Sequence, residues 1–363
     1  MKTHNSPVVI HITRSASRTS MPWNDLHKFL DGSEEIDSRF IVVNSLHRSR
    51  RVNSDESGDE YIDVGIFGLF KAIWVASTEF DRRRVILHCH NASLFIPSLI
   101  VSYLLRVRVL FNIHNDWLNF SYPQIVNICV AAVLRKKLIC VSRAVKDSLP
   151  KKHHIFDFNV IEYIDNSIDT RFLNSKYPLK NQSKARCKKI IIVARMVPQK
   201  NTKLLLEIIK RLDVTWTVNW FGDGPERHMV ESELRLTKAK CTINIMGVVA
   251  RQVVFDELSS SMLYLACSKW EGIGVANLEA AALGCIPLLS NIPAHNDISL
   301  NTGAVICDLS NLHSWLDAIE KISKDQTTNL ELSKKISSAT RESYGRDRMI
   351  QKYIAIYRCL PAG

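Results

Sequence analysis

The sequence predicts an α/β protein of two domains, each built on a parallel β-sheet. Short apolar runs typical of buried parallel strands recur along the chain and alternate with segments of helical pattern. The clearest runs are Val85–His90, Arg108–His114 and Leu263–Cys267. A chain of 363 residues is long for one hydrophobic core, and it suits two domains of about 150–200 residues each.

The charge balance is basic but evenly spread. The net charge is +12, and each half carries +6, with 24 Lys and Arg against 18 Asp and Glu in residues 1–180 and the same numbers in residues 181–363. Such an excess favours anionic ligands or an anionic membrane surface. Nucleic acid is a weaker interpretation, because no stripe of Lys and Arg interleaved with aromatic residues occurs.

Cysteine usage and apolar runs indicate the compartment. Nine cysteines without a C-x-x-C pair favour free thiols in a reducing environment and argue against zinc. The first residues lack the apolar core of a signal peptide. The longest apolar stretch, Ala92–Leu105, is about 14 residues long and too short to span a bilayer. We therefore expect a cytoplasmic protein, soluble or peripheral on the inner face of the plasma membrane.

The stretch Trp270–Asp297 carries the strongest chemical signal. A glycine loop leads into a helix of strong helix formers over Val275–Leu283. Glu271 precedes the loop, and Glu279 lies about two helical turns later. The free amides of a helix start suit a diphosphate, and the two carboxylates suit the hydroxyl groups of a sugar and a ribose. A βαβ unit with two solvated glutamates remains the structural alternative.

Residues 271–287, Glu-Gly-Ile-Gly-Val-Ala-Asn-Leu-Glu-Ala-Ala-Ala-Leu-Gly-Cys-Ile-Pro, resemble the E-x7-E signature of retaining glycosyltransferases of family 4. The resemblance implies the GT-B fold, in which two Rossmann-like domains with parallel sheets face a cleft. It implies an acceptor-binding domain over residues 1–180 and a nucleotide-sugar-binding domain over 187–343, joined by a polar linker at 176–189. A C-terminal helix, about 344–363, would cross back to the first domain.

A second motif lies at residues 195–201, Arg-Met-Val-Pro-Gln-Lys-Asn, and resembles the family's G-R-L-x-x-x-K-G element. Arg195 and Lys200 flank a loop at a strand's carboxyl edge. The planar guanidinium group of Arg195 and the compact ammonium group of Lys200 can bind the same diphosphate there. Surface charge is the alternative. The resemblance extends to a G-D-G-P-E turn and an F-x-G element. It implies these donor-binding residues: Glu279, Gly272, Ile273, Gly274, Val275, Gly222, Gly224 and Gly247.

The first domain carries weaker signals. His114 follows a predicted strand, where open α/β sheets place ligands, and it resembles the family's histidine that contacts the transferred sugar. His88 and His90 are interpreted as core residues or as residues that support a site residue from behind. The loop after the first strand lacks the family's Gly-Gly, and its Arg14 and Arg18 are candidates for an acceptor's phosphate or acidic sugar. A solvated basic loop is an equal alternative. Residues 48–63 are expected to form a charged surface loop.

These features predict a retaining glycosyltransferase without a cofactor. We expect it to be metal-independent, because no Asp-x-Asp occurs in the chain to clamp a diphosphate through a metal. As the resemblance implies, Arg195 and Lys200 stabilise the leaving diphosphate, Glu271 orients the sugar and His114 contacts a sugar hydroxyl. The acceptor is a glycan or a lipid-linked molecule of bacterial surface polysaccharide or lipopolysaccharide biosynthesis.

Three alternatives stay open: a nucleotide-sugar epimerase of the same fold, an inactive binding subunit of a glycan-assembly complex, and a nucleic-acid-binding protein. Basic clusters at 135–137 and 151–154 are candidates for contact with an anionic membrane, with a solvated face as the alternative. The sequence does not identify the base, the sugar or the acceptor.

Overall fold

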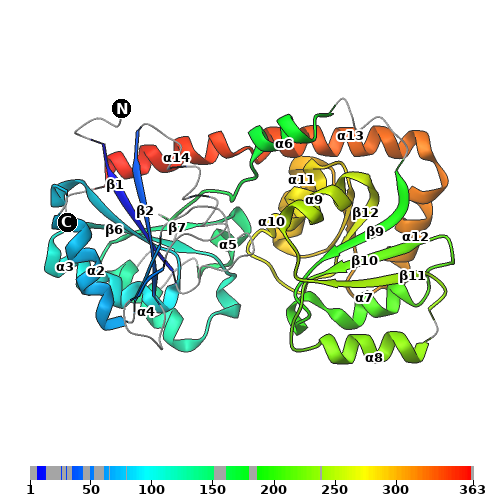
Figure 1. Ribbon diagram of the computed structural model, residues 1–363, viewed down its shortest axis with the longest axis horizontal. Helices are drawn as coiled ribbons and strands as arrows, with labels where there is room; N and C mark the ends of the chain where they lie inside the picture. Colours follow the sequence, from blue (N-terminus) through cyan, green and yellow to red (C-terminus); the bar gives the residue numbers. More distant parts are fainter. Residues whose placement is uncertain are drawn as a thin grey trace. The chain divides into compact units, whose positions relative to one another are not determined.

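The computed structural model describes residues 6–13, 26, 30, 35–43, 50–52, 61–64, 66–78, 80–150, 161–179, 186–237 and 239–360. The chain divides into two compact units, whose elements are labelled in Figure 1. The first unit contains Met1–Asn166 with Arg346–Gly363, and the second contains Ser167–Gly345. Each unit has its own sheet and its own hydrophobic core.

The boundary between the units lies earlier than the predicted one at residue 180. Ile168 pairs with Gly345 in a β-bridge, and Arg341 Nη1 donates a hydrogen bond of 2.7 Å to Asn174 Oδ1. Helix α6 (Thr170–Lys176) therefore packs within the second unit. The predicted linker at 176–189 starts at the end of this helix and finishes inside strand β9 (Cys187–Val193).

The first unit is built on an eight-stranded sheet in the order β3-β4-β2-β1-β5-β6-β7-β8. The strands are β1 (Val8–Thr13), β2 (Asp37–Val43), β3 (Arg50–Val52), β4 (Tyr61–Val64), β5 (Val85–Cys89), β6 (Arg108–Ile113), β7 (Lys137–Cys140) and β8 (Glu162–Tyr163). Only the β3–β4 pair is antiparallel among the described strands. Within the expected surface loop at 48–63, residues 50–52 and 61–63 form strands instead, and Ile62 and Val64 of β4 pair with Ile41 and Val43 of β2. The rest of that segment lies outside the described residues.

Helices cover both faces of this sheet, since alternate strand residues point to opposite sides. One face, with Ile10 and Ile12, packs against α2 (Ile66–Thr78), α3 (Phe95–Leu105) and α4 (Tyr122–Val133). The shorter helices of this unit are α5 (Arg143–Ser148) and the 3-10 helices η1 (Arg82–Arg84), η2 (Ala92–Leu94) and η3 (Trp117–Asn119).

The opposite face of the sheet is covered by the C-terminal helix α14 (Arg346–Cys359). Val9 and Ile86 of the sheet pack in one cluster with its apolar stripe, which consists of Met349, Ile350, Tyr353, Ile354 and Tyr357. Asn112 Nδ2 also donates a hydrogen bond of 2.8 Å to Tyr353 Oη. The prediction that the last helix returns to the first domain is therefore confirmed.

The second unit has a fully parallel six-stranded sheet in the order β11-β10-β9-β12-β13-β14. Its further strands are β10 (Thr217–Phe221), β11 (Thr242–Gly247), β12 (Ser261–Ala266), β13 (Ile286–Ser290) and β14 (Val305–Cys307). Its helices are η6 (Pro198–Lys200), α7 (Thr202–Ile209), α8 (Arg227–Thr237), α9 (Arg251–Ser260), α10 (Val275–Ala282), α11 (Pro293–Thr302), α12 (Leu312–Lys324) and α13 (Gln326–Ser343).

Both sheets reverse their strand order near the middle. The second unit has the doubly wound order 3-2-1-4-5-6 with its switch point between β9 and β12, and six strands of the first unit repeat this order with the switch between β1 and β5. Ligands of open α/β sheets bind outside the carboxyl ends of the strands at such a point. The topology therefore directs attention to the residues that follow β9 and β12, and to those that follow β1 and β5.

Candidate functional site

Two charged side chains meet at the switch point of the second unit. Lys200, from the loop after β9, donates a hydrogen bond to Oε1 of Glu271, from the loop after β12. Ser268 Oγ donates to the same oxygen at 2.7 Å. The structure thus brings together two of the predicted catalytic residues from opposite sides of the switch point.

The charge state of Glu271 is set by this environment. Burial alone would raise the pKa of this carboxyl group, but attraction to Lys200 and hydrogen bonds from Lys200 and Ser268 outweigh it, so the pKa lies below its ordinary value. Glu271 is therefore ionised at neutral pH and is available as an acceptor of hydrogen bonds.

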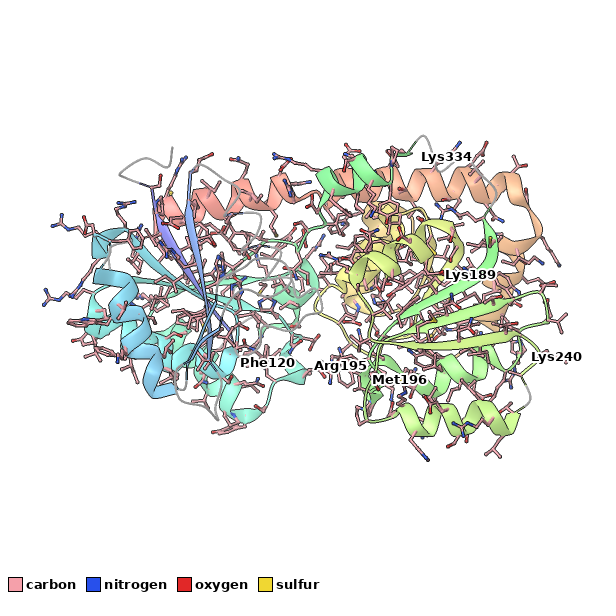
Figure 2. The ribbon with its side chains drawn as sticks, in the orientation of Figure 1. Phe120, Lys189, Arg195, Met196, Lys240 and Lys334 are labelled. Carbon is pink, nitrogen blue, oxygen red and sulfur yellow. The ribbon has the colours of Figure 1, made fainter. Side chains whose placement is uncertain are left out.

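Arg195 occupies the start of the same β9 loop but has a different setting. Its side chain is exposed, and within the described part of the chain its guanidinium group has no ion-pair partner. Figure 2 labels it beside Met196, which is buried in the core of the second unit. The loop is thus anchored by an apolar side chain, while its arginine is available to an anion.

The glycines at 222 and 224 are required by close backbone packing. A Cβ atom on Gly222 would lie 2.3 Å from the carbonyl oxygen of Ala194, and one on Gly224 would lie 2.4 Å from that of Met196. The backbone amide of Gly222 also donates a hydrogen bond of 2.7 Å to Gly247 O. These glycines let the loop after β10 pack closely against the loop that carries Arg195. This packing alone requires glycine at both positions, without a bound ligand.

Residues 272–275 form the turn that starts helix α10. Gly274 has φ +75°, a left-handed conformation that favours glycine, and a Cβ atom there would lie 2.4 Å from Asn277 Nδ2. The side chain of Ile273 is buried in the core. Of this predicted donor-binding segment, Ile273 therefore offers a ligand its backbone rather than its side chain.

Glu279 lies on α10 and is buried. Arg251 of α9 contacts it through two guanidinium nitrogens, with Nε 2.9 Å from Glu279 Oε1. The same guanidinium group lies 5.1 Å from the centroid of the Phe255 ring. Sequence reasoning missed Arg251, although its position four residues after Gly247 of the F-x-G element was an available signal.

A buried polar chain supports the loop that carries Glu271. Asn277 Nδ2 lies 2.9 Å from His295 Nε2, and His295 Nδ1 lies 3.1 Å from the carbonyl oxygen of Ser290. Ser290 Oγ in turn donates a hydrogen bond of 2.6 Å to Ser268 O. Burial, opposed by Glu271, lowers the pKa of His295 to about 4, so the ring is neutral at neutral pH. No local pattern in the sequence indicated this connection.

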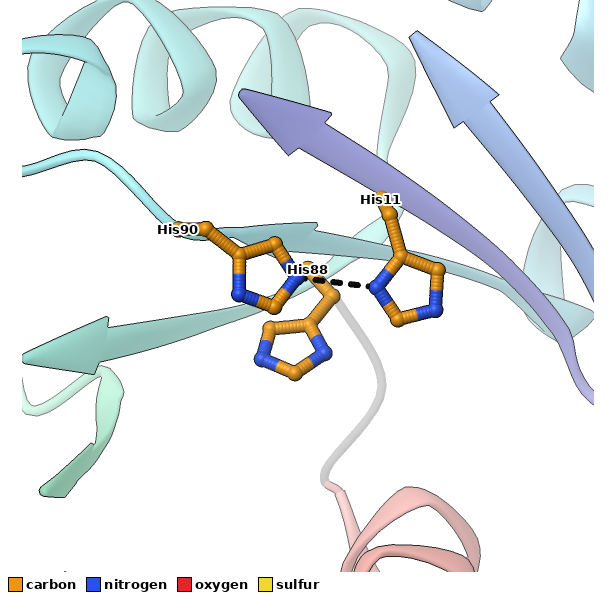
Figure 3. A group of neighbouring side chains, drawn as sticks. All are labelled: His11, His88 and His90. Carbon is orange, nitrogen blue, oxygen red and sulfur yellow. Dashed lines mark hydrogen bonds between the residues drawn. The ribbon is translucent and has the colours of Figure 1, made fainter. Parts of the chain in front are cut away.

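Four histidines gather near the switch point of the first unit. His90 Nε2 lies 2.9 Å from His11 Nδ1, and its other ring nitrogen lies 3.4 Å from His114 Nε2. His88 Nδ1 lies 2.8 Å from Tyr357 Oη. His88 and His90 are buried as expected, and His114 directly follows β6. Figure 3 shows the rings of His11, His88 and His90 side by side.

Burial disfavours the charged form of two of these rings. Burial lowers the pKa of both His88 and His114 to about 3. Ring nitrogens of His11, His88 and His90 lie within 4.8 Å of one another, the only group with metal-ligand spacing among the residues that the structure describes. A metal ion would need one nitrogen from each ring, but one nitrogen of His11, one of His88 and both of His90 already take part in the contacts given above.

The predicted acceptor residues Arg14 and Arg18 lie outside the described residues, as does the basic cluster at 151–154. Thr13, the last residue before that loop, donates a hydrogen bond of 2.8 Å from Oγ1 to Asn91 Oδ1. This contact joins the carboxyl ends of β1 and β5 at the switch point.

Known proteins resemble the chain in sequence and in fold. Residues 175–343 match the family described as glycosyl transferases group 1. The phosphatidylinositol N-acetylglucosaminyltransferase GPI3 subunit of Saccharomyces cerevisiae is 23% identical over 256 residues, covering 65% of this chain and 54% of that protein. The GDP-mannose:cellobiosyl-diphosphopolyprenol alpha-mannosyltransferase of Xanthomonas oryzae is 24% identical over 161 residues, covering 43% and 42%. The chain thus spans about half the length of these curated relatives.

Solved structures share the fold at low sequence identity. The Anabaena protein HepE, crystallised with UDP and glucose, superposes with a TM-score of 0.75 at 12% identity over 98% of this chain and all of that one. Sucrose-phosphate synthase from Thermosynechococcus elongatus gives 0.76 at 11% identity, over 97% and 98%. Residues 175–343 of the second unit thus match the glycosyl transferases group 1 family, in a chain that has the GT-B fold.

Proposed function

We propose that the protein is a retaining glycosyltransferase that moves a sugar from a nucleotide-sugar donor to a glycan or lipid-linked acceptor. The observation that carries the proposal is the contact of Lys200 with Glu271 at the switch point of the family-matched unit. A cation for the diphosphate and a carboxylate for the sugar hydroxyls occupy the edge at which such sheets bind ligands.

The proposed chemistry relies on electrostatic stabilisation of the leaving group. As the bond between sugar and diphosphate breaks, negative charge grows on the diphosphate. Lys200 and the exposed Arg195 lie on one loop, and we propose that they neutralise this charge. The amino end of α10 adds free backbone amides. We propose that this set replaces a metal ion. The diphosphate oxygen would then take the proton of the attacking hydroxyl group, on the same face of the sugar.

The remaining roles follow the resemblance. Glu271 would orient the sugar, and Glu279 would hold the ribose, its carboxylate being fixed by Arg251. The backbones of residues 272–275 and of Gly222, Gly224 and Gly247 would border the nucleotide. We propose, from the resemblance alone, that His114 of the first unit contacts a sugar hydroxyl and that Arg14 and Arg18 contact the acceptor.

The acceptor and the compartment are proposed from chemistry. The names of both curated relatives above specify acceptors that are phosphate-bearing lipids, which supports a lipid-linked acceptor here. We extend this to bacterial surface polysaccharide or lipopolysaccharide biosynthesis. All nine cysteines are free, which supports a reducing compartment and hence the cytoplasmic side of a membrane.

A donor screen tests the proposal. The purified chain is heated with UDP-, GDP- and dTDP-sugars, and a donor at about 100 times its Kd adds roughly 2.7 kcal/mol to stability, a readily visible shift in Tm. For the donor that binds, transfer or slow hydrolysis is then measured through the amount of nucleoside diphosphate released. The proposal is abandoned if no nucleotide sugar shifts the Tm.

The same assay separates the alternatives. An epimerase would convert the donor without an acceptor and without releasing a nucleoside diphosphate. An inactive binding subunit would show a Tm shift without turnover; the relative from Saccharomyces cerevisiae is itself named as a subunit, which favours keeping this candidate. A nucleic-acid-binding protein would bind duplex in a salt-dependent way and leave nucleotide sugars unbound.

A further inference from the structure

Three neighbouring helices of the first unit carry almost no charge. Across the 13, 11 and 12 residues of α2, α3 and α4, the only charged side chain is Lys71, and neither Asp nor Glu occurs. By comparison, the 11 residues of α8 in the second unit are Arg-His-Met-Val-Glu-Ser-Glu-Leu-Arg-Leu-Thr, as is usual for a helix that faces water. The first three helices are therefore unusual for the surface of a protein in solution.

The outward sides of these helices expose large apolar side chains. Tyr103 of α3 is 84% exposed, Leu104 is 58% exposed, and Trp74 of α2 is 43% exposed. We call the set of exposed apolar residues on α2, α3 and α4, with Leu134 that caps α4, the apolar face. It consists of Phe70, Trp74, Val75, Ile100, Tyr103, Leu104, Tyr122, Val126, Val133 and Leu134.

The residues of the apolar face lie on neighbouring helices. α3 contacts both α2 and α4, and all three pack on the same side of the sheet through residues such as Ile73, Val101 and Ile128 (Figure 1). The exposed side chains therefore point away from the sheet. Large apolar side chains exposed together on neighbouring helices mark an interaction site.

Arginines lie at one end of the apolar face. Because β5, β6 and β7 are parallel, the ends of α2, α3 and α4 that precede them lie at the same edge of the sheet. The exposed basic residues there are Arg82, Arg83, Arg106 and Arg135, which we call the basic edge. The guanidinium group of Arg82 lies 5.0 Å from the centroid of the Trp74 ring, which links the basic edge to the apolar face.

Acidic side chains are few at this edge. Asp81 is exposed, and its Oδ1 accepts a hydrogen bond from the backbone amide of Arg83. Glu162 is paired with Lys137. The described part of the basic edge therefore keeps an excess of positive charge directly beside exposed aromatic and aliphatic side chains.

We infer that the apolar face and the basic edge dock the protein on an anionic lipid surface. Trp and Tyr side chains favour the headgroup level of a membrane, aliphatic side chains bury in the acyl boundary, and arginines bind lipid phosphates. A second copy of the chain fits less well, because α2, α3 and α4 contain neither Asp nor Glu and so offer the basic edge no acidic partner in a face-to-face contact. No helix in the described ranges has the length and hydropathy to span a membrane, so docking is peripheral.

The inference stands apart from sugar transfer, since lipid binding needs no nucleotide sugar. It identifies the first unit, rather than the family-matched second unit, as the part that contacts the lipid. It also gives a role to the apolar run at residues 92–105, which is too short to span a bilayer and whose helix leaves Ile100, Tyr103 and Leu104 in solvent.

Sedimentation with vesicles tests the inference. The full chain is spun with vesicles of phosphatidylcholine alone and of phosphatidylcholine mixed with phosphatidylglycerol. We expect binding to the mixed vesicles that weakens with salt. Tyr103→Glu combined with Leu104→Glu should lower the partition coefficient at least tenfold, and Arg106→Gln or Arg135→Gln about fivefold each.

Matched controls lie in the second unit. Leu300 is exposed and apolar, and Lys334 is exposed and basic, so Leu300→Glu and Lys334→Gln should leave vesicle binding unchanged. Because every changed residue is exposed, circular dichroism should show intact folding in all variants. Lys200→Ala should also bind vesicles normally, which separates this inference from the proposed function. Absence of vesicle binding, equal loss in the controls, or a dimer that the Tyr103 and Leu104 changes dissociate would overturn the inference.

Discussion

Lys200 donates a hydrogen bond to Glu271 across 71 positions of sequence, joining the loops that follow the two strands at the switch point of the second unit. Neither side chain is well exposed, and Ser268 fixes the same carboxylate oxygen from a second direction. The pair is therefore ordered before any ligand binds. A ligand that takes both groups would find them in place, which is how a preorganised electrostatic site acts.

Replacing Lys200 by alanine should lower kcat by about 10²-fold or more, because the diphosphate loses a cation in the transition state. Steady-state kinetics with the donor found by screening would measure it. Lys203→Ala, on the exposed side of α7 three residues away, should change kcat little. A decrease under about threefold in Lys200→Ala, with folding intact, would remove the assigned role.

The contact of Arg251 with Glu279 gives a prediction about stability. Arg251→Met should lower the free energy of unfolding by about 1–3 kcal/mol, because it leaves a buried carboxylate without its charged partner. Adding Glu279→Leu should restore part of this loss, since no unpaired charge then remains. Urea unfolding of the two single variants and the double variant gives the coupling free energy. Simple additivity of the two changes would contradict the prediction.

The sequence predicted the parts of the fold and site that depend on local patterns. Apolar runs located the central strands, the glycine at 284 ended a helix at the expected place with φ +80°, and two motifs located Lys200 and Glu271. It did not predict the contact of Arg251 with Glu279 or the position of His295. Those contacts join separate helices, and no spacing within either helix determines the partner.

The misplaced boundary has a similar cause. Composition marked residues 176–189 as a linker because they are polar, but the division of the chain is set by long-range pairing, such as that of Ile168 with Gly345. The strand at Tyr61–Val64 was missed because two apolar residues in a charged segment give no clear periodicity, although the neighbouring β2 supplies the pairing.

Gly224 gives a prediction about packing. Its backbone does not have a positive φ, so Gly224→Ala would be tolerated locally, but the new methyl group would lie 2.4 Å from the carbonyl oxygen of Met196. We expect a loss of about 1–3 kcal/mol in unfolding free energy from this overlap. Gly303→Ala provides the comparison, because its Cβ would meet only Ile336 at 4.0 Å and its cost comes from φ +81° alone, about 1–2 kcal/mol. Equal Tm values for wild type and Gly224→Ala would contradict the close approach.

His295 predicts how stability depends on pH. Its pKa is about 4 in the folded chain, against about 6.5 for an exposed histidine. Between these values the unfolded chain binds a proton that the folded chain does not, so the free energy of unfolding falls as pH decreases from 6.5 towards 4, by up to about 1.4 kcal/mol per pH unit for this group. His88 and His114, with pKa values of about 3, should act in the same direction in the first unit.

The contribution of His295 can be isolated by substitution. His295→Gln keeps a polar side chain but removes the titration, so its stability should depend less steeply on pH between 6.5 and 4 than that of the wild type. Urea unfolding at several pH values gives the slope of the unfolding free energy against pH. Tryptophan fluorescence reports the unfolding, since Trp220 and Trp315 are buried in the same unit. His313→Gln is the matched control, because His313 lies on the exposed side of α12 in the same unit. If the unfolding free energy of His295→Gln and of the wild type depends on pH with the same slope, His295 is protonated in the folded chain. The hydrogen bonds of a neutral His295 to Ser290 and Asn277 would then be wrong.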